Sequence, residues 1–356
     1  MSVWDDYPTD YRSSQVQRIL SAVQAGESTA VIGLSGSGKS NLLGYLAHRW
    51  GKAGTRPRLV LVDCNRLTDP SSSGFYRLVR AALGDLSTAP NELITLEALL
   101  DQILAAPSPL GLLLDRFDAL TEQTHSSIYS NLRALRDTHK YELAYVIATR
   151  RPLDPHNELA ELFFAHTLWL GPLNESDIAW NVARYARRSG LNWDIEVSRQ
   201  MAVLSGGYPA LLRAICEAHT DGCPLSTTDL SQHPAVQRRL DEFWADQPDA
   251  VTLQRCGLNN NPLLVTSQQP YQIDTSELTA KEHALWEYLQ AHPDQVCEKD
   301  DLIRAVWPED RIFERGVRDD SLAQLVRRLR EKIEVDPSKP RHIHTVAGRG
   351  YRYLPQ

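Results

Sequence analysis

The 356-residue sequence contains little of what is typical of secreted or membrane-spanning proteins. Its five cysteines are odd in number and form no Cys-x-x-Cys pair, which argues against a zinc site and against a disulfide framework. Free cysteines suit a reducing compartment, so we expect a cytoplasmic protein. The longest apolar runs, such as Leu110–Leu114, are far shorter than the about 20 residues of a membrane span. We therefore expect no membrane partner, and nothing resembles a signal peptide.

Net charge is uninformative overall but uneven along the chain. The formal charge of −7 gives no general sign of nucleic-acid binding. Residues 276–310 contain nine acids and three bases, whereas residues 311–356 contain eleven Lys or Arg and six Asp or Glu. Any contact with nucleic acid is therefore expected in residues 311–356.

The most informative motif is Gly-Leu-Ser-Gly-Ser-Gly-Lys-Ser at residues 33–40, a complete phosphate-binding loop. Its glycines let backbone N–H groups turn toward a polyphosphate, Lys39 reaches the β- and γ-phosphates, and Ser40 offers a hydroxyl to Mg²⁺. A short apolar strand precedes the loop and an amphipathic helix follows it. We expect a nucleoside triphosphate to bind here. The candidate binding residues are Gly33, Ser35, Gly36, Ser37, Gly38, Lys39, Ser40 and Asn41.

Short apolar strands alternate with helices from residue 12 to about residue 170. This order predicts an α/β P-loop NTPase fold, a parallel sheet with helices on both faces, and the strands are Leu-rich or β-branched, as buried strands are. A helical lid and a third region are expected to follow. The expected strands lie at residues 30–33, 59–63, 111–115, 144–149 and 167–170; the expected domains are an NTPase core at 1–172, the lid at 173–247 and the third region at 248–356.

A Walker B pattern follows about 75 residues after the loop, where the apolar strand 112–115 ends in acids. Asp115 is expected to hold the Mg²⁺ water shell, so Ser40 and Asp115 are the candidate metal ligands. Arg116 stands where hydrolysing NTPases of this type commonly have a catalytic Glu. Asp118 can polarise water only if the backbone turns it inward. Asp115 and Asp118 are the candidate catalytic residues, but hydrolysis is less strongly indicated than binding.

The expected strand 144–149 ends at Thr149 and is followed by two arginines, Arg150 and Arg151. In a doubly wound sheet this end lies beside the phosphate site. A guanidinium there can sense the γ-phosphate through charge-assisted hydrogen bonds. We assign this role to Arg150, although the adjacent Arg151 leaves the choice open. Farther along, Pro209 occupies the first turn of a helix, where its missing N–H costs nothing.

The segments GLSGSGKS, LLLDRFD, NLRALRD, VIATR and GGYPALL occur in an order that resembles the STAND class of signalling ATPases, which are close to the origin-recognition AAA+ ATPases. The resemblance covers roughly residues 10–245. It implies ATP or ADP as the nucleotide, Pro209 against the adenine and Arg150 as the sensor arginine. Origin-recognition proteins would carry a sensor arginine near the start of the lid helix. Here Pro209 holds that place and Arg213 lies one turn later, which favours the STAND class.

The same resemblance implies two further features. The family's extended N-terminal segment touches adenine, so Tyr11 and Arg12 are candidates for the base pocket. ATP commonly drives assembly in this family, so we expect self-association. Arg133 and Arg136 are then candidate contacts to a neighbouring subunit.

The C-terminal region predicts three helices and a hairpin. Thr279 and Glu282 form a capping box before the first helix. The second helix covers residues 299–306, and the third, residues 317–334, has one apolar face and one polar, basic face. Two short strands around a Gly-Arg-Gly turn follow, so the pattern is helix-turn-helix plus wing.

This region closely resembles the OmpR/PhoB-type winged-helix DNA-binding domain, because LTAKE, DDLIRAVWP, LVRRLREKIE and HTVAGRGYRY match its segments in order. The resemblance implies an α+β domain on double-stranded DNA, with a small N-terminal sheet at about 253–273. The helix 317–334 would enter the major groove, and Arg349 would approach the minor groove. Candidates for base or phosphate contacts are Ser321, Gln324, Arg327 and Arg328. Arg341 and Arg352 are candidates for phosphate contacts.

Together the two resemblances predict an ATP-dependent DNA-binding regulator of transcription, in which nucleotide state controls exposure or assembly of the winged helix. Two alternatives stay open. One is a STAND-type defence or signalling switch whose winged helix docks on the nucleotide domain or on a partner. The other is an AAA+ factor that remodels DNA in replication or transposition. A separate sensor or effector protein is a further candidate partner.

Overall fold

The computed structural model describes residues 3–354 except 53, 107, 122–125, 157, 268–277, 308–318, 335–336, 338–339, 341 and 347. The chain divides into two compact units, Met1–Ser267 and Gln268–Gln356. Each unit has its own apolar core, so we describe them one at a time. In the described part of the chain, no helix is both long and apolar enough to cross a membrane.

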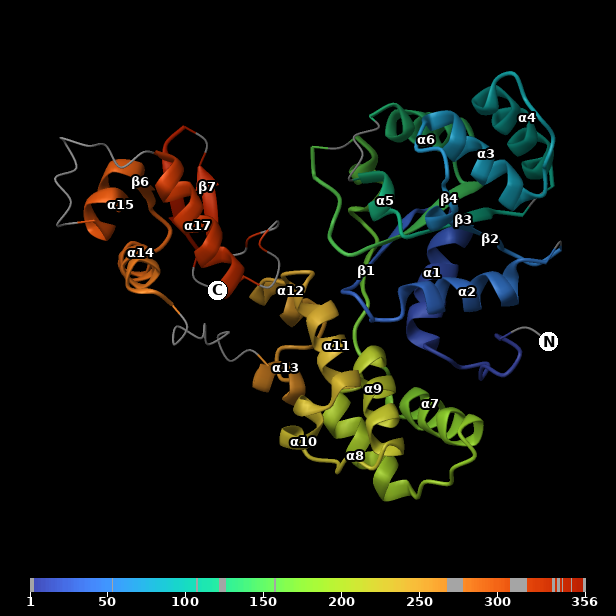
Figure 1. The fold of residues 1–356 in the computed structure, drawn as a ribbon. Helices are drawn as coiled ribbons and strands as arrows, with labels where there is room; N and C mark the ends of the chain where they lie inside the picture. The colour runs from blue at the N-terminus through green and yellow to red at the C-terminus, as the bar shows by residue number, and fades with distance from the viewer. Residues whose placement is uncertain are drawn as a thin grey trace. The chain divides into compact units, whose positions relative to one another are not determined.

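A five-stranded parallel sheet in the order β2-β3-β4-β1-β5 forms the centre of the first unit (Figure 1). Its strands are β1 (Thr29–Ile32), β2 (Arg58–Asp63), β3 (Leu110–Asp115), β4 (Leu143–Thr149) and β5 (Thr167–Trp169). In the register, Ile32 of β1 lies opposite Thr149 of β4. Because every pair of neighbours is parallel, the carboxyl ends of β1, β3 and β4 meet at one edge. The predicted P-loop NTPase fold is confirmed.

Helices cover both faces of this sheet. Successive side chains of a strand point to opposite faces, and Val31 joins one apolar cluster whereas Ala30 and Ile32 join the other. Helices α1 and α2 contribute to the first cluster, and α3, α4 and α6 contribute to the second. The helices are α1 (Ser13–Gln24), α2 (Lys39–Trp50), α3 (Ser72–Leu83), α4 (Glu92–Leu104), α5 (Asp118–Thr121) and α6 (Ser126–Thr138), with 3-10 turns η1 (Cys64–Arg66) and η2 (Glu158–Phe163).

A group of helices follows β5 and packs together, drawn green to yellow in Figure 1. Leu211 and Ile215 of α9 and Leu240 and Phe243 of α11 are buried in the cluster that also covers one sheet face. Pro209 takes the first position of α9, as expected. These helices, called the lid below, are α7 (Glu175–Arg188), α8 (Ile195–Ser205), α9 (Pro209–Thr220), α10 (Thr227–Gln232) and α11 (Pro234–Trp244).

The small sheet expected at about 253–273 is wrong for residues 253–267, which belong to two helices and their connection. Helices α12 (Ala250–Arg255) and α13 (Pro262–Ser267) lie in the first unit, which extends to Ser267 instead of ending near residue 247. Side chains cap both helices: Asp249 accepts the Thr252 N–H at 2.7 Å, and Asn261 accepts the N–H of Leu263 at 3.1 Å. Leu253 and Leu263 are buried in the core of this unit. Residues 268–273 lie outside the described residues.

The second unit is a winged helix, as predicted. A three-stranded antiparallel sheet in the order β6-β8-β7 packs with its helices around one core. The capping box is present, and Glu282 accepts the Thr279 N–H at 2.8 Å. The elements are α14 (Ala280–Ala291), β6 (Val296–Glu298), α15 (Lys299–Val306), α17 (Asp319–Ile333), β7 (Ile343–Val346) and β8 (Gly350–Tyr353). Residues 317 and 318, expected to start the third helix, lie outside the described residues.

Candidate functional site

The phosphate-binding loop leads from β1 into α2 at the carboxyl edge of the sheet. Gly36 and Gly38 have φ values of 85° and 91°, in the left-handed region that favours glycine. Gly38 is the N-cap of α2, so the loop leads directly to the N-terminal N–H groups of this helix. A Cβ on Gly36 would lie only 2.4 Å from the Cβ of Ala210 in α9. Glycine at this position therefore also permits close approach of the lid.

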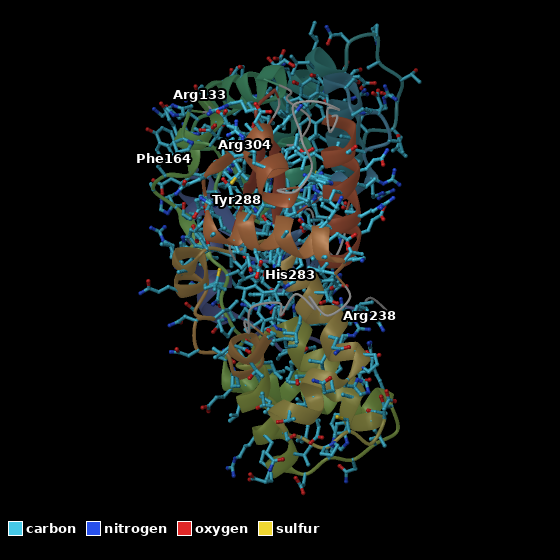
Figure 2. All side chains as sticks on the ribbon, turned by 60° about the vertical axis from the view of Figure 1, so that its left-hand side comes forward. Arg133, Phe164, Arg238, His283, Tyr288 and Arg304 are labelled. Carbon is cyan, nitrogen blue, oxygen red and sulfur yellow. The ribbon has the colours of Figure 1, made fainter. Side chains whose placement is uncertain are left out.

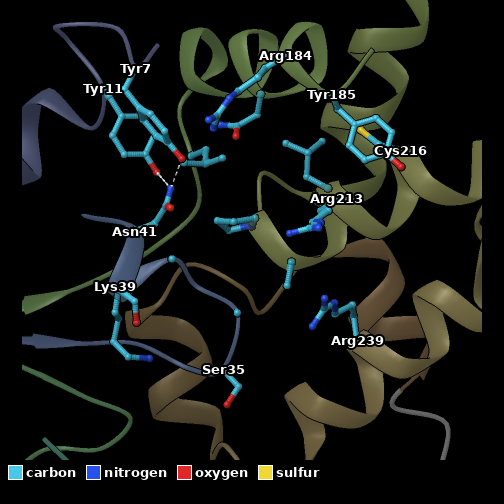
Figure 3. A pocket seen from close by; sticks show the side chains of 18 of the residues that line it. Tyr7, Tyr11, Ser35, Lys39, Asn41, Arg184, Tyr185, Arg213, Cys216 and Arg239 are labelled. Carbon is cyan, nitrogen blue, oxygen red and sulfur yellow. Dashed lines mark hydrogen bonds between the residues drawn. The ribbon is translucent and has the colours of Figure 1, made fainter. Parts of the chain in front are cut away.

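The loop opens onto a cavity of about 920 Å³, a size that accommodates a nucleotide. Arg184, Arg213 and Arg239 project toward it from lid helices α7, α9 and α11 (Figure 3). Most of the predicted nucleotide-binding residues line this cavity: Tyr11, Ser35, Gly36, Gly38, Lys39, Ser40, Asn41, Asp118, Arg150 and Pro209. The remaining predicted residues, which are described but do not line the cavity, are Arg12, Gly33, Ser37 and Asp115.

The predicted metal ligands lie together beneath the loop. Ser40 lies close enough to Asp115 to favour the ionised form of its carboxyl, which also accepts the backbone N–H of Arg116 at 3.0 Å. Asp115 is only 6% exposed, and burial raises its pKa. A hydroxyl and a carboxyl oxygen are the kind of ligands that Mg²⁺ takes beside phosphate oxygens, so these two residues fit the ion. Among the described residues, no cluster of three or more His, Cys, Asp or Glu side chains offers another metal site.

Lys39 folds back onto its own loop. Its Nζ donates to the carbonyl oxygen of Leu34 at 3.2 Å and also to that of Gly33. Burial lowers the pKa of Lys39, while the negative charges of nearby carboxylates, Asp118 first, oppose this fall. The negative charges of Asp118, Asp246 and Asp115 therefore act on Lys39, the residue that is expected to bind phosphates.

Arg150 lies where the sheet topology predicts, next to the loop. Its backbone N–H donates to both carboxyl oxygens of Asp118, at 3.0 and 3.1 Å. The guanidinium Nη1 of Arg150 lies 3.3 Å from Oδ1 of Asp246. The neighbouring Arg151 is not a lining residue of the cavity in the described structure, and its Nη2 donates to the Asp246 carbonyl oxygen at 2.8 Å. Arg116, at the position expected for a catalytic Glu, is exposed and lines the cavity. Of the two arginines after β4, Arg150 is thus the one that faces the site.

Tyr11 and Arg12, the candidates for the base pocket, have different surroundings. Asn41 Nδ2 donates to the hydroxyl of Tyr11 at 3.3 Å and to that of Tyr7 at 2.7 Å (Figure 3). Arg12 is 1% exposed, and its guanidinium donates to the carbonyl oxygens of Ser37, at 3.0 Å, and Gly171, at 3.1 Å. Tyr11 therefore lines the cavity, whereas Arg12 holds the backbone of the loop.

Sequence reasoning missed Asp246, which follows the last residues of α11. Its Oδ2 accepts the backbone N–H of Ser35 at 2.5 Å, and the residue is 7% exposed. A single acid after a helix carries no motif, and 211 positions separate it from Ser35. No local signal was available to find it.

The predicted DNA-contacting residues fall on the exposed side of the winged helix. Ser321, Gln324, Arg327 and Arg328 are exposed on α17, while the apolar face of this helix is buried. Arg349 is exposed in the turn between β7 and β8, and Arg352 on β8 is half-buried. Ion pairs are present at this surface: Arg327 lies 3.0 Å from Glu331 and Arg349 lies 3.6 Å from Glu298. Arg341 lies outside the described residues.

The two arginines expected to contact a neighbouring subunit lie on α6. Arg133, labelled in Figure 2, places its Nη1 2.7 Å from Oε2 of Glu161. Arg136 lies 3.5 Å from Asp137 and donates to the Gly26 carbonyl oxygen at 3.5 Å. Both are partly buried, and their role in assembly stays a prediction.

Comparison with known families covers both units. Residues 11–254 match the family model described as Novel STAND NTPase 1. The chain belongs to this STAND NTPase family. Residues 274–353 match the model of the C-terminal domain of transcriptional regulatory proteins, in agreement with the winged-helix fold. Both resemblances inferred from the sequence are confirmed.

Similar proteins include a probable transcriptional regulatory protein of Picosynechococcus sp., 40% identical over 76 residues, or 21% of this chain and 29% of that protein. The uncharacterized transcriptional regulatory protein YcbL of Bacillus subtilis is 29% identical over 137 residues, 36% of this chain and 55% of YcbL. The chain thus spans 29% of the length of the first relative and 55% of the length of YcbL. Among solved structures, a Walker-type ATPase of Pyrococcus abyssi is 13% identical with a TM-score of 0.47, covering 99% of this chain and 97% of that one. Cdc6p from Pyrobaculum aerophilum is 13% identical with a TM-score of 0.45, covering 100% and 94%.

Proposed function

We propose that this STAND NTPase is an ATP-dependent DNA-binding regulator of transcription, in which the bound nucleotide sets the exposure or assembly of its winged helix. One observation carries the proposal: a single chain joins a phosphate-loop cavity to a winged helix whose exposed face presents Arg327 and Arg328. The family match to regulatory C-terminal domains supports the second half of this combination. The likeness to transcriptional regulators supports its use in transcription.

In the nucleotide site, the loop residues and Lys39 would bind the phosphates, and Ser40 with Asp115 would hold Mg²⁺. The ion would neutralise phosphate charge. Arg150 faces the cavity, so it is our choice for the residue that distinguishes ATP from ADP through the γ-phosphate. Tyr11 and Pro209 line the cavity and are our candidates for base contacts.

Fast hydrolysis is not the role that this site supports best. Arg116 replaces the expected glutamate, and Asp118 already accepts the Arg150 N–H with both carboxyl oxygens. A carboxylate engaged in this way is suited to hold the end of β4 in place. We therefore propose that nucleotide binding and release set the state of the protein, with slow turnover at most.

The nucleotide half is tested with Lys39→Ala in calorimetric titrations of ATP. Loss of a hydrogen bond to a charged group costs about 1.5–3 kcal/mol, so ATP affinity should fall about 10- to 100-fold. Lys52→Ala, which removes an exposed lysine just beyond α2, is the matched control and should bind as the wild type does. Unchanged affinity in Lys39→Ala would refute the site.

The DNA half is tested by replacing Arg327 and Arg328 together with alanine and measuring duplex binding at several salt concentrations. If both contact phosphates, affinity should fall and the salt slope should decrease by about 2. The double variant of Arg187 and Arg238 is the charge-matched control, because both arginines are exposed on lid helices; Arg238 is labelled in Figure 2. Equal DNA affinity in the Arg327 and Arg328 variant would refute this surface. A wild type that binds no duplex with ATP or ADP would favour the signalling switch whose winged helix docks on protein.

A further inference from the structure

Asp246 lies at a corner of the lid where the chain turns from α11 toward α12. Gln247, the next residue, has a φ of 47°, a left-handed conformation that is uncommon outside glycine. The corner is anchored at the sheet, because Arg151 donates to the Asp246 carbonyl oxygen at 2.8 Å. This anchoring directs the Asp246 carboxylate at the phosphate-binding loop.

The two oxygens of this carboxylate bind two groups that the proposed function assigns to phosphate. Oδ2 accepts the backbone N–H of Ser35 at 2.5 Å, and Oδ1 lies 3.3 Å from Nη1 of Arg150. A loop N–H group and a guanidinium are what a phosphate oxygen seeks in such a site. The charge of Asp246 also acts on Lys39. A carboxylate of the lid thus has the partners of a bound phosphate.

The contact is part of a larger junction between lid and loop. The Tyr208 hydroxyl donates to the carbonyl oxygen of Ser35, and the Ala210 N–H donates to that of Gly36 at 3.2 Å. Ser35 is therefore bonded to the lid through both its N–H and its carbonyl oxygen. The ring of Tyr208 packs edge-on against Phe243 of α11, 5.4 Å between centroids. A change at Ser35 must therefore affect α9 and the end of α11 together.

We propose that Asp246 is an internal competitor of the terminal phosphate of ATP, which holds the lid on the loop until a γ-phosphate displaces it. The inference rests on the proposed nucleotide site. A phosphate oxygen and the Asp246 carboxylate cannot both take the Ser35 N–H, and two anions at one place repel each other. ATP binding must break the Asp246 contacts, whereas ADP, which has no γ-phosphate, leaves them in place.

The displacement has a defined route along the chain. Asp246 lies between α11 and helices α12 and α13, and the winged-helix unit begins after Ser267. Release of this corner therefore acts first on the segment that leads to the winged helix. Asp246 thereby makes the lid sensitive to whether a third phosphate is present.

Binding of ATP and ADP to Asp246→Ala tests the competition. Removing the carboxylate should tighten ATP binding about tenfold or more, because ATP no longer has to break the bonds of Asp246 to charged groups. The affinity for ADP should change less than about threefold. Asp246→Asn keeps the shape of the side chain without its charge, and should shift the ratio of ATP to ADP affinity in the same direction if the alanine variant does not fold. Asp241→Asn, an exposed acid of α11, is the matched control and should leave the ratio unchanged.

Loss of the Asp246 competition and loss of the nucleotide site give different binding results. If the wild type binds ATP through Lys39 but the Asp246 variants keep its ratio of ATP to ADP affinity, the competitor is refuted and the nucleotide site stands. If neither the wild type nor any variant binds nucleotide, the site itself is refuted.

Hydrogen exchange of the wild-type chain provides a test without substitution. ATP should increase deuterium uptake in peptides that cover residues 243–258, where the N–H of Asp246 now bonds to the Phe243 carbonyl oxygen at 3.2 Å. ADP should leave uptake there close to that of the protein alone. Equal uptake with ATP and ADP would overturn the proposal.

Discussion

Replacing Arg12 with alanine should destabilise the first unit without changing its preference among bases. The guanidinium donates to the carbonyl oxygens of Ser37, in the phosphate-binding loop, and Gly171, just after β5. Removing it leaves both acceptors without this donor, and each buried polar group left unpaired costs about 1–3 kcal/mol. Because the Gly171 bond is only partly buried, we expect about 2–4 kcal/mol in total.

Thermal unfolding without nucleotide measures this cost. At about 2–4 °C per kcal/mol for a unit of this size, the melting temperature should fall by about 4–16 °C. Arg18→Ala, which removes an exposed arginine from helix α1 just after Arg12, is the control and should change the melting temperature little. Arg12→Lys keeps the charge but not the planar fork that spans two carbonyl groups, so it should restore only part of the stability.

Nucleotide selectivity decides between the two roles considered for Arg12. If Arg12 supports the loop, its loss should weaken ATP and GTP binding by the same factor. If it contacts the base, as the family resemblance implies, the ratio of ATP to GTP affinity should change. An unchanged melting temperature together with a changed ratio would refute the structural role.

Two further predictions concern acidic side chains with shifted pKa values. Burial raises the pKa of Asp115, so this group adds stability below its unfolded pKa and loses that contribution as pH rises through the folded pKa. Asp115→Asn should therefore raise the stability of the nucleotide-free protein at pH 8 by about 1 kcal/mol, and the stabilities of the variant and the wild type should converge at about pH 4. Thermal unfolding measures both, and equal stability at pH 8 would contradict the reasoning. For Glu282, burial favours the neutral form, but hydrogen bonds from Lys332 Nζ at 2.7 Å and the Thr279 N–H at 2.8 Å lower its pKa overall. Glu282→Gln should thus destabilise α14 at pH 7 by about 1–3 kcal/mol, a difference lost as pH falls through the folded pKa; hydrogen exchange of residues 280–291 measures it, and a pH-independent effect would contradict the assignment.

The parts of the fold that the sequence predicted are those fixed by local patterns. The strands beside the phosphate loop are short apolar runs, and β3 differs from its prediction only by starting at Leu110. The capping box of Thr279 and Glu282 fixed the start of α14 within one residue. Both signals act over a few neighbouring residues, so they are visible without the rest of the molecule.

Residues 253–267 form helices instead of the expected small sheet because burial, not composition, decides their structure. The Asn and Gln residues of this stretch are typical of turns, yet Asn261 caps helix α13. In the folded chain Asn261 Nδ2 also donates to the Ser205 carbonyl oxygen at 2.5 Å, and Leu263 and Leu264 pack in the core of the first unit. These partners are distant in sequence, so helix propensity alone could not place α13 in this unit.

In the candidate site too, the residues of a local motif could be predicted, whereas their partners from distant parts of the chain could not. A loop motif identifies donors, such as the Ser35 N–H and Lys39, but not the groups that satisfy them. The absence of a side chain at Gly36 has two consequences. It leaves the backbone free to bind phosphates, and it lets Ala210 come so close that a Cβ on residue 36 would clash with it. The loop is therefore both a ligand site and the docking site of the lid. Any ligand that rearranges Ser35 and Gly36 must alter lid docking, because the bonds to Asp246, Tyr208 and Ala210 all use backbone groups of these two residues.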